Sequence, residues 1–169
     1  MPVLKEANLQ DIEKEYLFIR DMPGNENGME NEWHGVSRTD FKAKALPAML
    51  DHAAGRNLKP GYVPDTTYFL WEDDRILGVY HFRHFLNDSL REGAGHIGCY
   101  IAPAYRGKGF GTKGLRLMLE IAFERIPEDE VYLRVYKYNT PSLSAMLRCG
   151  GYIHHEDTEH YFVRVKKNP

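Results

Sequence analysis

The sequence predicts an α/β (α+β) domain in which a mixed, mostly antiparallel, twisted sheet carries helices on both faces. Two β-rich runs, 67–71 and 75–85, are separated by a short polar turn, which permits antiparallel pairing but leaves no room for a crossover helix. A third apolar strand, 97–101, leads through a glycine-rich loop into an amphipathic helix. A further strand, a helix and a closing hairpin follow, so strands and helices both contribute to the core.

Length and composition fit one domain over residues 1–169. Apolar residues make up 43% of the chain and charged residues 27%, as in ordinary globular proteins, and a net charge of −2 gives no footprint for nucleic acid or an anionic membrane. The two cysteines, Cys99 and Cys149, have neither disulfide nor metal spacing, which favours a reducing compartment. The N-terminal residues lack the apolar core of a secretion signal, so we expect a cytoplasmic location.

The first third of the chain predicts a strand over residues 2–7, two helices and a loop. Asn8, three residues before an aspartate, is typical of a helix cap, and apolar side chains then recur on one helical face at Ile12, Tyr16 and Ile19. Residues 21–35 are polar and acidic and predict a loop, after which a second helix begins near Thr39. Its apolar stripe consists of Phe41, Ala45, Met49 and Ala53. Because Pro47 lies inside this helix, we expect a kink or a break there.

The second half continues with a polar loop over 87–95 before strand 97–101. The helix after the glycine loop carries one stripe of apolar side chains, at Leu115, Leu119, Ala122 and Ile126. The elements expected after that helix are a strand over 131–136, a helix over 139–150 and a hairpin over 152–155 and 161–165.

The segment from Arg106 to Thr112 joins strand 97–101 to the following helix and contains three glycines. Glycine lets the backbone turn tightly, so several N–H groups can point into one concavity at the start of the helix. Such a concavity lies at the positive end of the helix dipole and binds phosphate. Cationic side chains gather around the loop, namely Arg106, Lys108, Lys113 and Arg116. The sequence therefore predicts a site for a pyrophosphate.

Two other interpretations of the loop stay open. Gly109, Gly111 and Gly114 have the spacing of a dinucleotide-binding fingerprint, and acidic residues follow at 128–130. In that fold the first glycine follows the strand almost directly, whereas here Pro103 and several polar residues intervene. The other interpretation is a turn without a ligand, against which the clustered cations argue.

The loop resembles the coenzyme A loop of the GNAT N-acetyltransferases through the pattern Arg106-x-x-Gly109-x-Gly111, with a strand and a proline before it and a helix after it. Strand 131–136 with Asn139, Ser142 and the end at 150–152 is similar to that family's second motif. The order of elements agrees with the family over nearly the whole chain.

Within the family, residues 83–87 (RHFLN), 95–98 (GHIG) and the late Gly150-Gly151 are similar to a bacterial subgroup of unassigned substrate. The resemblance also implies central strands that splay apart at a bulge near Tyr100, which would make a cleft.

The resemblance implies acetyl-CoA as cosubstrate, without a metal. Backbone groups of Cys99 and Ile101 would pair with the pantetheine arm, and the Ile101 N–H would polarise the thioester carbonyl and stabilise the oxyanion. The pyrophosphate would lie beside Arg106 on the amides of Gly107, Lys108, Gly109, Phe110, Gly111 and Thr112. Asn139 and Ser142 lie where the family contacts the coenzyme near its sulfur. Cys99 as a nucleophile is the alternative, although buried strand cysteines are commonly inert and the family transfers acetyl directly.

The acceptor amine must lose a proton before it attacks, and His96 lies where the family places its general base. The competing interpretation is a strand-end histidine satisfied by the backbone. His81 and His84, three residues apart on a strand, point to opposite faces and form no metal pair, although one could line the acceptor cleft. Three further histidines, His154, His155 and His160, are expected in solvent.

Many family members place a tyrosine seven residues after the motif asparagine to protonate the departing thiolate, and here that residue is Met146. A thiol pKa of about 8.5 makes water sufficient, and Ser142, Tyr138 and Tyr152 are candidate replacements. Acidic residues Glu26, Glu30 and Glu32, with Trp33 beside them, lie in the region that often covers the acceptor site. They either attract a cationic amine or form a solvated loop.

The resulting hypothesis is an N-acetyltransferase that moves an acetyl group from acetyl-CoA to a primary amine by direct attack in a ternary complex. The alternatives are a non-catalytic acyl-CoA-binding module and a dinucleotide-binding oxidoreductase. The acceptor could be a polyamine, an amino acid, an antibiotic-like amine or a protein terminus. We expect no nucleic-acid or membrane partner, and a homodimer is an expectation from the family alone.

Overall fold

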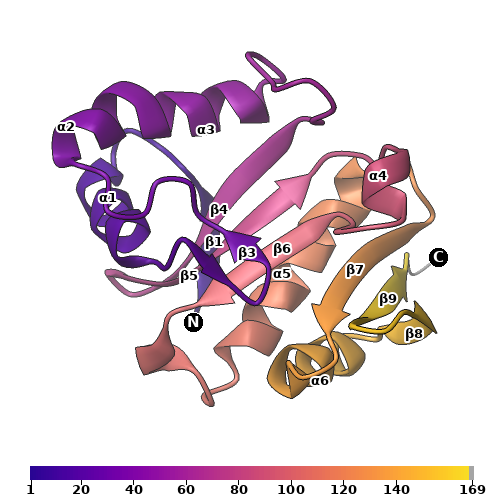
Figure 1. The fold of residues 1–169 in the computed structure, drawn as a ribbon. Coiled ribbons are helices and arrows are strands. Elements are labelled where there is room, and N and C mark those ends of the chain that lie inside the picture. Colours follow the sequence, from indigo (N-terminus) through magenta and orange to yellow (C-terminus); the bar gives the residue numbers. More distant parts are fainter. Residues whose placement is uncertain (168–169) are drawn as a thin grey trace.

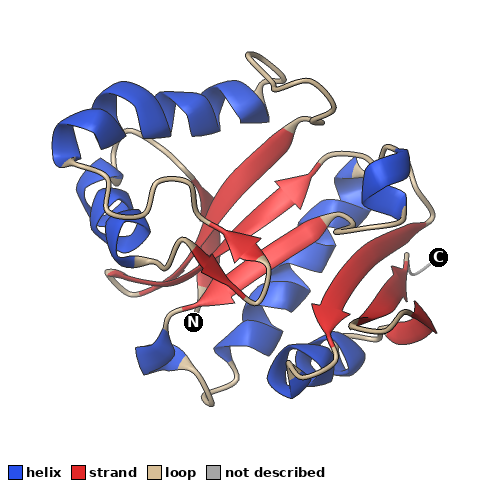
Figure 2. Ribbon diagram, in the orientation of Figure 1, coloured by secondary structure: helices blue, strands red, loops and turns tan. Residues whose placement is uncertain are grey.

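Two antiparallel sheets form the centre of the molecule (Figures 1 and 2). The computed structural model describes residues 1–167, so the last two residues of the domain predicted over 1–169 lie outside the described part. The larger sheet has the order β1 (Val3–Glu6), β4 (Asp65–Glu72), β5 (Arg75–Arg83) and β6 (Ile97–Ile101). The smaller sheet has the order β7 (Glu130–Tyr136), β9 (His160–Lys166) and β8 (Tyr152–Glu156). Every pairing within them is antiparallel, which confirms the mostly antiparallel arrangement.

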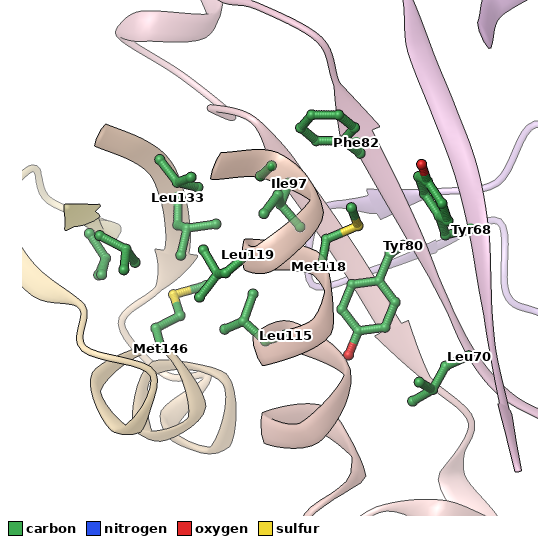
Figure 3. Packing of buried hydrophobic residues seen from close by; sticks show 14 of the residues in the cluster. Tyr68, Leu70, Tyr80, Phe82, Ile97, Leu115, Met118, Leu119, Leu133 and Met146 are labelled. Atoms are coloured by element: carbon green, nitrogen blue, oxygen red, sulfur yellow. The ribbon is translucent and has the colours of Figure 1, made fainter. Parts of the chain in front are cut away.

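Helices cover the larger sheet on both faces, as predicted. Helices α1 (Ile12–Asp21) and α3 (Leu46–Ala53) pack on one face, and α5 (Phe110–Arg125) packs on the other, with α6 (Thr140–Arg148) beside α5. Strands β4 and β5 are buried on both sides, because alternate side chains enter the two core clusters. Tyr68 and Leu70 pack toward α5, whereas Phe69 and Trp71 pack toward α1 and α3. Figure 3 shows the first cluster, in which Leu115, Met118 and Leu119 of α5 meet the strands.

The irregularity predicted at Pro47 takes the form of a π-helical turn, Phe41–Ala45, between α2 (Arg38–Asp40) and α3. The Leu46 N–H donates to the Phe41 carbonyl five residues earlier. Proline has no N–H to donate, and this longer turn carries the helical path past it. Phe41, Ala45 and Leu46 are fully buried, which fixes this face against the sheet.

Two short elements lie where the sequence predicts only loops. The first is the hairpin of β2 (Asn25–Glu26) and β3 (Met29–Glu30), and the second is α4 (Asp88–Arg91), which Asn87 caps by accepting a hydrogen bond from the Leu90 N–H at 3.0 Å. The predicted cap at Asn8 is also displaced. Its side chain accepts from the Gln10 and Asp11 amides, and α1 begins only at Ile12.

The predicted bulge near Tyr100 is wrong. Strand β6 pairs with β5 in continuous register from Gly78–Ile101 to Phe82–Ile97. The central strands do splay apart, but they do so next to Gly95, before β6 begins. Gly95 and Leu133 form an isolated bridge there, which joins the two sheets. Within residues 1–167, no helix has both the length and the apolar character needed to cross a bilayer.

Candidate active site

The two sheets separate at Gly95 and His96. The His96 N–H donates to the Tyr132 carbonyl of β7 at 2.8 Å, while its carbonyl accepts from the Arg83 N–H of β5, also at 2.8 Å. Gly95 has a φ of +68°, and a Cβ there would lie 2.2 Å from the Tyr132 carbonyl oxygen, so only glycine fits. Past this junction β6 and β7 follow different sheets, which leaves a cleft between them.

The cleft forms part of a cavity of about 1040 Å³. Its walls come from the β2–β3 hairpin, the end of β5, strands β6 and β7, the glycine loop and the first turns of α6. Segments that are far apart in the sequence therefore meet around one space, with the hairpin lying in front of β6 in Figure 1.

The glycine loop presents unpaired amides to the cavity. Gly107 and Gly109 have φ angles of +72° and +79°, and Gly109 caps α5 in the left-handed conformation. The first intrahelical bond runs from the Lys113 N–H to the Gly109 carbonyl at 3.1 Å, so the amides of Phe110, Gly111 and Thr112 precede it and have no helical partner. Gly107, Gly109, Phe110, Gly111 and Thr112 all line the cavity. This is the concavity that the sequence predicts.

The cationic side chains predicted around the loop do not all turn toward the cavity. Lys108 donates from Nζ to the Ala104 carbonyl at 2.9 Å, and neither it nor Lys113 nor Arg116 is among the lining residues. Arg106 does line the cavity, but its guanidinium donates to the Glu26 carboxylate at 3.2 and 2.5 Å and its Nε donates to the Ile101 carbonyl at 2.8 Å. Arg106 therefore ties the loop to the hairpin and to the end of β6.

The open edge of β6 also faces the cleft. The Ala102 N–H donates to the Leu77 carbonyl, so alternation places the backbone groups of Ile101 and Cys99 on the side away from β5. Both residues line the cavity. Burial raises the pKa of the Cys99 thiol to about 11, so the thiolate needed for nucleophilic attack is disfavoured.

The first turn of α6 forms another part of the cavity wall. Asn139 caps this helix by accepting a hydrogen bond from the Ser142 N–H at 3.4 Å, and both residues line the cavity. Met146 is buried and also belongs to the wall. Of the other candidate acids, Tyr138 is 67% exposed and Tyr152 donates to Glu130 at 2.6 Å, and neither is among the lining residues. Tyr136, which sequence reasoning missed, is a lining residue.

His96 does not line the cavity. Its side chain is fully buried, Nδ1 accepts from the Tyr132 N–H at 2.9 Å, and Nε2 lies 3.0 Å from the Glu128 carboxylate, to which this tautomer donates. Burial lowers the pKa of His96, although the Glu128 carboxylate opposes this effect. With both ring nitrogens in use, the predicted general-base role of His96 has no support in the geometry. The competing structural interpretation describes this residue.

Three histidines line the cavity. His52 and His160 each have a carboxylate partner, Asp65 at 3.4 Å and Asp157 at 3.3 Å, and the third is His81. The sheet register aligns it with Thr67 on β4 and Gly98 on β6, and no residue within 1–167 makes a hydrogen bond to its ring. Burial lowers the pKa of His81, with Arg83 and His52 acting in the same direction and Asp65 and Glu32 opposing it. The neutral imidazole is therefore favoured at pH 7. His84 lies on the other face, with its Nε2 2.8 Å from the Thr66 hydroxyl, as the strand alternation predicts.

The acidic residues of the hairpin region have separate roles. Glu26 binds Arg106, Glu32 binds Lys59 at 3.1 Å, and Glu30 lines the cavity without a cationic partner among the described residues. The hairpin is pressed against both sheets, because a Cβ on Gly98 would lie 3.2 Å from the Met29 sulfur and one on Gly28 would lie 3.2 Å from the Tyr136 ring. Residues 25–30 thus form a hairpin over the cleft, while Glu30 and Glu32 are exposed, as the solvated-loop alternative predicts.

Three other histidines lie in the closing hairpin of β8 and β9. His154 and His155 are exposed, as predicted, with their Nδ1 atoms 2.8 Å apart. His160, expected in solvent, is buried against Tyr136 at a ring distance of 4.3 Å. Within residues 1–167 no group of three or more His, Cys, Asp or Glu side chains is arranged to hold a metal ion.

The dinucleotide interpretation of the loop does not fit this geometry. Gly114, the third glycine of that spacing, is buried in α5 against Tyr80, and a Cβ there would lie 2.3 Å from the Tyr80 hydroxyl. Strands β6 and β7, which flank α5 in the chain, lie in different sheets rather than pairing in parallel.

Comparison with solved structures finds the same fold in several acetyltransferases. The structures include Campylobacter jejuni N-acetyltransferase PseH in complex with acetyl coenzyme A (20% identity, TM-score 0.62, covering 99% of this chain and 100% of that one). The ribosomal-protein-S5-alanine acetyltransferase from Vibrio fischeri aligns with a TM-score of 0.69 at 13% identity, over 98% of this chain and 92% of that one. Vibrio cholerae spermidine N-acetyltransferase, in complex with CoA and spermine, gives 0.62 at 15% identity, over 98% and 95%. A search of curated proteins gives no match.

The sequence model of the acetyltransferase (GNAT) family matches residues 31–151, which is more than half of the chain. This range begins just after the β2–β3 hairpin and runs through the glycine loop to the end of α6, and so contains most of the cavity wall. The chain belongs to the GNAT acetyltransferase family.

Proposed function

We propose that this protein transfers an acetyl group from acetyl-CoA to a primary amine, with both substrates bound in the one cavity. The observation that carries the proposal is the continuity of three features along its wall. The unpaired amides of the glycine loop, the open edge of β6 and the unpartnered imidazole of His81 follow one another around the same space.

The residues of the glycine loop fit the phosphate end of acetyl-CoA. The amides of Gly107 to Thr112 would hold the pyrophosphate at the N-terminus of α5, where the helix dipole favours negative charge. The Cys99 and Ile101 backbone would pair with the pantetheine amides. The Ile101 carbonyl already accepts from Arg106, which leaves its N–H to act on the thioester oxygen. Asn139 and Ser142 would lie beside the sulfur.

The chain's own residues then handle the protons. When bound, acetyl-CoA supplies the acetyl group as a thioester. His81, neutral at pH 7, would take the proton that the acceptor ammonium must lose before its nitrogen can form the amide bond. As the carbon–sulfur bond breaks, the Ser142 hydroxyl or a water would give a proton to the departing sulfur, whose free pKa of about 8.5 makes this requirement weak.

Calorimetry with acetyl-CoA and a thiol-release assay with a panel of amines test the proposal. We expect acetyl-CoA to bind, to shift the backbone amide resonances of residues 107–112, and to release thiol only when an acceptor is present. Thr112→Glu places a carboxylate at the phosphate site and should weaken binding by tenfold or more. Thr39→Glu, the same change at an exposed first-turn position of α2, is the control.

Two outcomes would contradict the proposal in different ways. Tight binding of acetyl-CoA without acceptor-dependent thiol release would favour a non-catalytic acyl-CoA-binding module, which the methionine at position 146 keeps open. No binding at all, with the resonances of residues 107–112 unmoved, would remove the coenzyme assignment.

A further inference from the structure

Three arginines line the cavity without an acidic partner within residues 1–167, namely Arg83, Arg134 and Arg148. Two of them, Arg83 and Arg134, lie near each other, whereas Arg148 is the last residue of α6. Arg83, at the end of β5, is half-buried and donates from NH1 to the Gly95 carbonyl at 3.2 Å, which uses one of its five N–H groups. Arg134, on β7, makes no hydrogen bond or ion pair with any residue of the described chain. Asp65 is the cross-strand neighbour of Arg83, but its carboxylate pairs with His52 at 3.4 Å instead.

The two guanidinium groups are close enough to influence each other. Burial lowers the pKa of Arg83, and the charge of Arg134 acts in the same direction, while Asp65 opposes both. Arginine nevertheless stays charged in proteins. Arg83 is partly desolvated and has a second positive charge nearby, which is costly without an anion to receive its hydrogen bonds.

The arginine pair lies at the opposite end of β6 from the glycine loop. Arg83 donates its N–H to His96, just before β6, whereas the loop follows Ala102 at its other end. A strand rises about 3.3 Å per residue, so roughly 20 Å of chain separates the two positions. The arginines are therefore suited to a group other than the phosphates expected at the glycine loop.

The surroundings of the pair suit a ligand that has an amine as well. His81 lies two residues from Arg83 on the same face of β5, about 7 Å along the strand. Asp65 and Glu32, which also line the cavity, are the carboxylates whose charges act on His81. Cationic and anionic groups thus alternate over a short distance next to the proposed base.

We infer that the amine acceptor also carries an anionic group, a carboxylate or a phosphate, which Arg83 and Arg134 bind while its amino group faces His81. This inference rests on the proposed acetyl transfer, and it names the acceptor class as small acidic amines. Every charge on a polyamine is positive, so a polyamine would be repelled by the two arginines. An acidic amine would instead place its negative charge against them.

Direct binding tests the inference without relying on turnover. Calorimetry in the presence of desulfo-CoA, which has no acyl group to transfer, would use two matched pairs of probes: glycine with glycinamide, and glucosamine 6-phosphate with glucosamine. We expect at least one acidic member to bind about tenfold or more tightly than its neutral partner. The two pairs separate a carboxylate ligand from a phosphate ligand.

Arg134→Gln removes one of the two proposed anion-binding charges and should abolish most of that preference. The variant should fold normally, because Arg134 is exposed and packs in neither core cluster. Arg75→Gln, the same change at an exposed strand position outside the cavity wall, should leave the preference unchanged. Arg83→Gln is a second variant, and its circular dichroism spectrum would report whether loss of the Gly95 contact disturbs the fold.

The outcomes distinguish this inference from the proposed function. If acidic amines bind through Arg134 but are never acetylated, the inference stands and the proposed function fails. If amines are acetylated while neutral amines or spermidine bind as well as acidic ones, or while Arg134→Gln leaves the preference intact, the inference is overturned and the proposed function stands. Failure of both acidic probes to bind at millimolar concentrations would also overturn the inference.

Discussion

The imidazole of His96 lies between the two sheets and donates from Nε2 to the Glu128 carboxylate at 3.0 Å, while its Nδ1 accepts from the Tyr132 N–H. Glu128 also accepts from the Leu86 N–H at 2.9 Å, so this pair links β5, β6 and β7 at the point where they separate. The histidine thereby joins the two sheets beside the cleft and is not among the residues that line it.

The first prediction concerns His96 and pH. Because burial lowers its pKa in the folded state, the unfolded chain binds a proton first as the pH falls. The stabilisation from His96 is therefore complete above pH 6.5, the ordinary histidine pKa, and declines as the pH falls below it. Urea unfolding of wild type and His96→Gln between pH 5 and 8 would measure this as a difference that shrinks at low pH.

His96→Gln should also lower the free energy of unfolding at pH 8 by about 2 kcal/mol or more, because a buried hydrogen-bonded network loses its geometry. His154→Gln, at an exposed position, is the control and should have little effect. A pH-independent difference would contradict the assignment of this titration to His96.

The second prediction concerns His81. His81→Gln removes the proposed base and should lower kcat/KM about 10²–10⁴-fold while acetyl-CoA binding is retained. Since burial lowers the pKa of His81, kcat/KM should rise with pH through a group below 6.5, and this acidic limb should be absent in the variant. An unchanged acidic limb would assign the base to another group. His155→Gln, at an exposed position, is the control and should leave the pH profile unchanged.

The third prediction concerns the hairpin. Glu26→Gln breaks the ion pair with Arg106 and should increase hydrogen exchange at residues 25–30, because the hairpin loses its attachment to the glycine loop. Global stability should change little, since the pair is 43% and 31% exposed. Glu13→Gln, which breaks the surface ion pairs of α1 with Arg38 and Lys42, should leave exchange in the hairpin unchanged.

The fourth prediction separates the glycines of α5. Gly114→Ala places a Cβ 2.3 Å from the Tyr80 hydroxyl and should destabilise the protein by about 1–3 kcal/mol, although alanine favours helices. In Tyr80→Phe that hydroxyl is absent, so the double variant should recover part of the loss. Gly111→Ala, whose Cβ has no neighbour nearer than 3.8 Å, serves as the stability control. Thermal denaturation of the four variants would show the coupling, and strictly additive losses would contradict it.

The sequence predicts the long elements, in which buried side chains recur at regular spacing. Strand β6, helix α5 and the glycine loop between them are where residue spacing placed them, because tight turns and helix starts use local rules. The β2–β3 hairpin was missed, since two-residue strands show no alternation and depend on distant contacts such as Glu26 with Arg106 and Met29 over Gly98.

The residues of the candidate site also fall into two groups, those predictable from local sequence and those that depend on distant contacts. The amides of the loop follow from glycine positions, but a single histidine on a strand carries no sign of whether it faces a cavity or a core. His81 and Arg83 share a face through strand alternation, which was a usable signal, whereas the burial of His96 depends on Glu128 from a distant segment. The cytoplasmic location and the homodimer stay predictions.

The unpaired rim of β6 has a consequence for association. A bare strand edge invites another chain to add a strand and so to aggregate. Here the β2–β3 hairpin and the first turn of α6 line the same cavity as this edge, so we expect them to hinder another polypeptide strand from pairing with it. We therefore expect the wall of the cavity to limit self-association through β6 as well.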